Sequence, residues 1–374
     1  MSKTIYGRLA LGLVMGLAPV CGGAETPAKF LGANSCASAS CHGGGGAHQD
    51  QFLVWSLKDF HSQRPPATLA TARSKQIADT LAIKDPTADA RCTVCHAPLN
   101  SVPENLRGEN FKVSEGVSCE SCHGAAENWL RAHTRKDYTR ADRTAAGMRD
   151  LQNLYVRANT CVACHQNVDN DILKAGHPEL IFELDGQSVA EPKHWQEGTN
   201  WSGAYVWYVG QAVALREMSW QLANEKSPPE DQINRWAALL WVMVLGETAG
   251  SNSFSPTHEN LVTVQTIWDK NARQMTAARV GWEGFDAIDI LRKLASTSAS
   301  FRDNSVSQNL QARRAERLVL ALDRNVAALP ELKNNKPVQS SLNQLFKLAQ
   351  SIPDFDPKEF AAALEKFSAA LSAP

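Results

Sequence analysis

Residues 119–123 read Cys-Glu-Ser-Cys-His, and the same pattern returns as Cys-Thr-Val-Cys-His at 92–96 and as Cys-Val-Ala-Cys-His at 161–165. A longer variant, Cys-Ala-Ser-Ala-Ser-Cys-His, occupies residues 36–42. In this pattern two thiols can reach the two vinyl groups on one edge of a porphyrin, and the next histidine can bind the iron. The sequence therefore predicts four covalent c-type haems with their irons. The predicted attachment residues are Cys36, Cys41, Cys92, Cys95, Cys119, Cys122, Cys161 and Cys164, and the predicted proximal ligands are His42, His96, His123 and His165.

Two other uses of these cysteines compete with haem attachment. Eight cysteines in an exported chain can form a disulfide framework, and paired cysteines also bind zinc or carry out thiol redox chemistry. A histidine directly after each second cysteine favours haem over both, because neither a disulfide nor a four-thiolate zinc site needs it. The wider motif at 36–42 keeps this histidine, so we expect a haem there too.

The sixth position of each iron needs a second ligand, which sets the reduction potential and decides between electron transfer and chemistry. Methionine is nearly excluded, because Met148 is the only one in the first half beyond the N-terminal segment. Histidine is available, although a lone histidine is often only a surface or hydrogen-bonded core residue. The favoured distal ligands are His61, His133, His177 and His194, while His48 and His258 are weaker candidates.

Three further pieces of the first half carry a family pattern: Trp55 through Asp59-Phe60-His61, residues 116–124, and Gly176-His177-Pro178. With them, the region from about Asn34 to Trp195 resembles the tetrahaem cytochromes of the c554-like family. The resemblance implies a compact, mostly helical domain with closely packed haem pairs and with ligands that cross between haems. By position it implies His133 as distal ligand of the first haem, His61 of the fourth, and His177 or His194 of the third and second.

This chain departs from the family in two respects. Its first motif is longer, which puts the geometry of that haem in question. In the family one haem can lack a sixth protein ligand, whereas this chain has enough histidines to fill every site. The histidine supply favours an electron carrier.

The N-terminus has the composition of an export signal. Lys3 and Arg8 precede the apolar stretch from Leu9 to Val20, and the small residues 22–24 follow. This pattern predicts a signal peptide over residues 1–24, cleavage near residue 24 and a periplasmic location. An uncleaved anchor and a lipoprotein at Cys21 are the alternatives. No later apolar run is long enough to span a membrane.

Residues 25–200 are thus expected to form a tetrahaem cytochrome domain with little regular sheet, and residues 201–374 an α-helical domain. The second part has no cysteine and shows apolar residues at helical spacing. Prolines and acidic first turns help to delimit its elements. The predicted helices cover residues 204–225, 233–245, 256–280, 285–294, 309–329, 337–351 and 357–371. The fold class is mostly α.

A formal net charge of −1 gives no indication of nucleic-acid binding. The favoured function is electron transfer with redox partner proteins, and association with a membrane electron-transfer complex is one candidate setting. The alternative is a multihaem oxidoreductase that acts on a small nitrogen or sulfur compound at an open haem. A haem-based sensor is a third hypothesis. Whether the chain is an enzyme stays open, with an electron carrier preferred.

Overall fold

The computed structural model describes residues 27–46, 49–197, 201–246, 255–277, 287–351 and 354–372. These residues are mostly helical, and they contain no sheet, only an isolated bridge between Phe30 and Arg107. The predicted mostly α fold class is confirmed. The predicted leader and the candidate ligand His48 lie outside the described residues.

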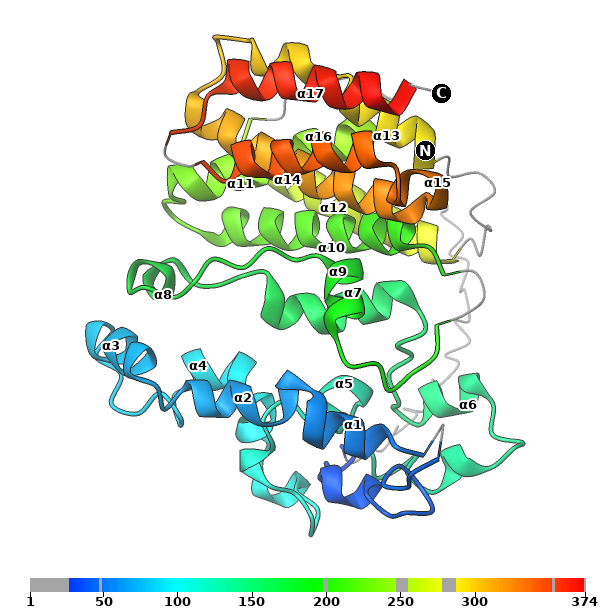
Figure 1. Ribbon diagram of the computed structural model, residues 1–374. Helices are drawn as coiled ribbons and strands as arrows, with labels where there is room; N and C mark the ends of the chain where they lie inside the picture. Colours follow the sequence, from blue (N-terminus) through cyan, green and yellow to red (C-terminus); the bar gives the residue numbers. More distant parts are fainter. Residues whose placement is uncertain are drawn as a thin grey trace, which may run out of the picture.

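The first part consists of short helices and turns, drawn in blue and cyan in Figure 1. Short elements are expected where a chain wraps around large cofactors and has few apolar side chains of its own to bury. The α-helices are α1 (Gln51–Lys58), α2 (Phe60–Thr68), α3 (Ala72–Thr80), α4 (Ala90–His96), α5 (Cys119–His123) and α6 (Arg140–Ala145). The 3-10 helices are η1 (Ala33–Cys36), η2 (Pro98–Ser101), η3 (Glu104–Leu106), η4 (Val113–Glu115) and η5 (Ala132–Thr134).

Three helices lie between the first three haem motifs and the long helices that follow: α7 (Leu154–His165), which contains the fourth motif, α8 (Asn170–Lys174) and α9 (Leu184–Ala190). The second part is a stack of longer helices, green to red in Figure 1. They are α10 (Gly203–Asn224), α11 (Glu230–Gly246), α12 (His258–Ala277), α13 (Ala287–Ala295), η7 (Thr297–Phe301), α14 (Gln308–Ala328), α15 (Pro330–Lys333), α16 (Lys336–Ala349) and α17 (Pro357–Ser372). Each predicted helix of this part corresponds to an observed one, with bounds that differ by a few residues; residues 278–280 and 285–286 of two predicted helices lie outside the described residues.

One hydrophobic core runs through the second part and continues into the first. Ala158 of α7, as well as Phe182 and Leu184 next to and on α9, are fully buried in the same cluster as the helices that follow residue 200. Gly210 lets α10 approach α9 closely, because a Cβ at this position would lie only 2.7 Å from the Cβ of Leu184. The division of the chain at residue 200 stays a prediction, and packing across it is continuous. None of the helices in the described ranges has the length and apolar character needed to cross a bilayer.

Candidate functional site

The predicted site residues converge on one large cavity of about 1610 Å³. Pockets for one drug-sized ligand span roughly 300–1,000 Å³, so this space is larger than one small ligand needs. All four motifs contribute to its lining, as do His61, His133, His177 and His194. Among the predicted site residues only Cys41 does not line it, and its side chain is exposed. His258 begins α12, away from the cavity, with its Nδ1 3.2 Å from the carbonyl of Ala223.

The motif histidines follow directly from the local helices. The helices α4, α5 and α7 end at His96, His123 and His165, so each Cys-x-x-Cys pair occupies the last turn before its histidine. Two cysteines three apart lie on the same face of a helix. This arrangement lets both thiols of one motif approach the same side of the cavity.

Three motif histidines face a predicted distal histidine across the cavity. The ring centroids are 6.1 Å apart for His42 and His133, 6.4 Å for His96 and His177, and 6.0 Å for His61 and His165. Two imidazoles on opposite sides of one metal have centroids about 6 Å apart, given metal–nitrogen bonds of about 2 Å and a ring radius of about 1 Å. The observed separations therefore match the span that one iron requires.

The remaining motif histidine, His123, is influenced electrostatically by His194 and, to a smaller extent, by His42 and His133. The Nδ1 atoms of His123 and His194 are buried, and that of His123 has no hydrogen-bond partner among the described residues. Burial lowers the pKa of His123 to about 4, with a further contribution from His194. Two neutral imidazoles in a buried space can bind a metal without losing a proton first.

Four other cavity histidines have their Nδ1 atoms placed against protein acceptors. Nδ1 of His42 is 2.9 Å from Oε1 of Gln51, and Nδ1 of His96 is 3.0 Å from the carbonyl of Pro65. His133 and His177 face backbone carbonyls in the same way, at 3.2 and 2.8 Å. Metal-binding histidines usually donate their second ring N–H to such an acceptor, which leaves Nε2 for the metal. These rings are thus fixed in the form that a metal needs.

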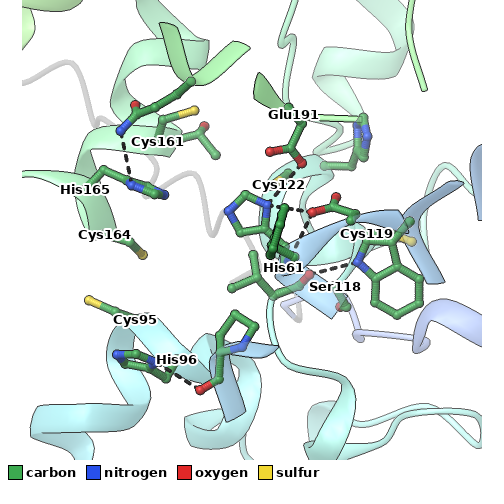
Figure 2. Close-up of a pocket in the computed structure, with 18 of the residues that line it drawn as sticks. His61, Cys95, His96, Ser118, Cys119, Cys122, Cys161, Cys164, His165 and Glu191 are labelled. Carbon is green, nitrogen blue, oxygen red and sulfur yellow. Dashed lines mark hydrogen bonds and ion pairs between the residues drawn. The ribbon is translucent and has the colours of Figure 1, made fainter. Parts of the chain in front are cut away.

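His61 differs from the others because carboxylates hold it. Its Nδ1 lies 3.1 Å from Asp59 and 3.0 Å from Glu191, as Figure 2 shows for Glu191. Hydrogen bonds to Asp59 and then to Glu191 raise the pKa of His61 to about 10. Asp59 also accepts the backbone N–H of His61 at 2.8 Å and so caps α2. His61 lies in the first turn of α2, which is separated from the end of α1 at Lys58 because the backbone of Asp59 is extended.

The thiols of different motifs come close together. Cys36 interacts with Cys119, and Cys95 interacts with Cys164, whose sulfur atoms face each other in Figure 2. Cys122 and Cys161 also interact. None of the eight described cysteines is in a disulfide.

The cavity also offers partners for anionic groups. Arg140, Arg143 and Arg149 line it, and the buried Nε of Arg143 has no hydrogen-bond partner. Haem carries two propionates, which such guanidinium groups can bind. The donor set, the histidine separations and this unpartnered Arg143 nitrogen all fit covalently bound haem.

Sequence reasoning missed the residues that hold these histidines in place, above all Gln51, Gln187 and Glu191. None belongs to a recognisable motif. The only local signal is the spacing of Gln187 and Glu191, which are four residues apart and thus on one helix face.

Residues 35–124 match the family model described as cytochrome c554 and c-prime. This segment includes the first three haem motifs and His61. No curated protein and no solved structure matches the chain. The matched segment is about a quarter of the chain, and over it the chain is similar to cytochromes c554.

Proposed function

We propose that this protein is a periplasmic electron carrier with four c-type haems, each bound by two histidines. The observation that carries the proposal is that three motif histidines lie opposite a second histidine, with ring centroids 6.0, 6.1 and 6.4 Å apart. The proposed groups are Cys36, Cys41 and His42 with His133; Cys92, Cys95 and His96 with His177; Cys119, Cys122 and His123 with His194; and Cys161, Cys164 and His165 with His61.

The thiol contacts support a continuous path between these groups. Cys36 of the first motif is hydrogen-bonded to Cys119 of the third, and Cys164 of the fourth to Cys95 of the second, while Cys161 of the fourth influences Cys122 of the third electrostatically. The order along the cavity is therefore first, third, fourth, second. Haem iron supplies the one-electron redox change, and its potential is set by ligands, hydrogen bonds and burial.

The histidine pairing argues for electron transfer rather than catalysis at an open iron. An oxidoreductase of the alternative kind needs one iron without a strong distal ligand. Every motif histidine here has a second histidine close by. Redox partner proteins would exchange electrons at the ends of the row, and proteins of the c554 family are typically periplasmic.

Haem stoichiometry tests the proposal. The full chain, produced in a host that matures c-type cytochromes, is expected to carry four covalent haems by intact mass and by the pyridine haemochrome assay. The double variant Cys36→Ser/Cys41→Ser is expected to carry three. Fewer than four haems in the unchanged protein contradicts the proposal, and four haems in the double variant removes the wide motif from it.

A further inference from the structure

Both histidines proposed for the fourth haem contact the same short segment of the chain, at α9. Gln187 of α9 lies with its side-chain amide 3.2 Å from Nδ1 of His165. Glu191, which directly follows α9, lies 3.0 Å from Nδ1 of His61. The backbone N–H of Glu191 donates to the carbonyl of Gln187 at 2.9 Å, so the two side chains are held one turn apart. Figure 2 shows His165 and His61 with these contacts as dashed lines.

The side-chain amide of Gln187 can accept a hydrogen bond from Nδ1 of His165 if the amide is turned over. A histidine bound to iron through Nε2 carries its hydrogen on Nδ1 and must donate it. The Oε1 atom of Gln187 is buried and without a partner, while its Nε2 faces His165. Because amide oxygen and nitrogen are similar in size, turning the amide over places Oε1 against the Nδ1–H of His165. This orientation gives Oε1 a hydrogen bond to His165 and moves Nε2 into the buried position that Oε1 occupied.

The segment is anchored to the helical second part from its other end. Gln211 of α10 donates to Oε1 of Glu183 at 3.0 Å and to the carbonyl of Phe182 at 2.9 Å. Arg324 of α14 pairs with Asp185 at 3.3 Å. These polar groups are mostly buried, and buried networks fix geometry more firmly than exposed ones. The position of α9 is thus set by α10 and α14 rather than by the haem half alone.

The two contacts differ in charge. A carboxylate that accepts the Nδ1–H makes the imidazole more electron-donating and stabilises ferric over ferrous iron, whereas a neutral amide oxygen does so less. We propose that α9 is a positioning element through which the helical second part sets the reduction potential of the fourth haem, with Glu191 acting through His61 and Gln187 through His165. This inference rests on the proposed ligation of that haem by His61 and His165.

The test exchanges amide and carboxylate at nearly constant size. Glu191→Gln is expected to raise the potential of one haem, and Gln187→Glu is expected to lower the potential of the same haem. Outer-shell partners commonly change metal-site properties tenfold or more, and a roughly tenfold change in the ratio of reduced to oxidised haem is about 59 mV for one electron. The matched charge control is Glu365→Gln on α17, whose partner is Arg302, far from the cavity.

The measurement is a spectroscopic redox titration of the full holoprotein, with ferric electron paramagnetic resonance spectra of each variant. Opposite shifts at one haem support the inference, because general loosening of the structure would move both variants the same way. Shifts of equal sign, shifts at different haems, or four unchanged potentials overturn it. If the unchanged protein lacks a fourth low-spin haem, the proposed function fails and this inference fails with it. If the protein has four low-spin haems and their potentials are the same in both variants as in the unchanged protein, only this inference fails.

Discussion

The imidazole rings of His42 and His133 lie nearly parallel, with 18° between their planes and 6.1 Å between their centroids. Their Nδ1 atoms face Gln51 and the carbonyl of Trp129. Both Nε2 atoms are therefore available to a metal placed between the rings. Although the first motif is the widened one, the centroid separation between His42 and His133 is close to the separations found for the histidines of the second and fourth motifs.

Removing His133 is expected to open the iron of the first haem. His133→Ala should convert one haem of four from low-spin to high-spin in the ferric state, because the ring of His133 is the one that stacks opposite His42. Electron paramagnetic resonance and the visible absorption spectrum measure this change. His258→Ala is the matched control and should leave all haems low-spin. A wholly low-spin His133→Ala protein would remove His133 from the assignment.

The exposed thiol Cys41 provides a test of the wide motif. Cys41→Ser should leave the first haem attached by one thioether, through Cys36, which is buried beside Cys119. The pyridine haemochrome band should then shift to longer wavelength by an amount consistent with one singly linked haem in four. Identical bands for Cys41→Ser and the unchanged protein would mean that Cys41 forms no thioether.

Close packing of α9 on α10 predicts a stability effect at Gly210. In Gly210→Ala the added Cβ would lie 2.7 Å from the Cβ of Leu184, so the helices must separate slightly. Overpacking of this kind costs about 1–3 kcal/mol, although alanine also favours the helix by up to about 1 kcal/mol. Chemical denaturation followed by circular dichroism should show a net loss. Gly203→Ala, with open space around it, is the control and should not destabilise the protein.

The buried acids near α9 predict a pH dependence of stability. Burial raises the pKa of Glu183 to about 8 and that of Asp185 to about 6. A carboxyl with a raised folded-state pKa stabilises the fold fully below its unfolded pKa, and this contribution is lost as pH rises through the folded value. The free energy of unfolding should therefore fall between about pH 5 and about pH 8, by up to about 1.4 kcal/mol per pH unit for each group.

The variant Glu183→Gln isolates one of these groups. It should flatten the pH dependence mainly between about pH 6 and about pH 8, where Asp185 is already ionised. Glu365→Gln serves as control, because this exposed side chain has its pKa lowered by Arg302. An unchanged slope in Glu183→Gln would show that Glu183 is ionised throughout this range.

The sequence predicted those features that depend on local pattern. The apolar periodicity of residues 309–329 matches α14 at Gln308–Ala328, and the acidic start after Pro228 matches α11. The break at Asp59 has no clear signal in the sequence, because an aspartate that caps a helix looks the same as one on a solvated helix face. The short helix α9 was missed too, since Leu184–Ala190 contains glycine, serine and aspartate, and it is fixed by packing on α10 rather than by propensity.

In the candidate site, too, the features set by local sequence could be predicted and those set by the tertiary fold could not. Attachment cysteines and their histidines are local motifs and can be read directly from the sequence. Pairing of His61 with His165, or contact of His61 with Glu191 across 130 positions, depends on the tertiary fold. Gln187 and Glu191 therefore could not be found without it.

The central claim is that every haem iron has two histidine ligands. Low-temperature electron paramagnetic resonance of the ferric holoprotein tests it most directly. The account predicts only low-spin signals that integrate to four haems once spin coupling between neighbours is included. A high-spin signal equal to one haem would contradict it, and would direct attention to an enzyme acting on a small nitrogen or sulfur compound at that iron.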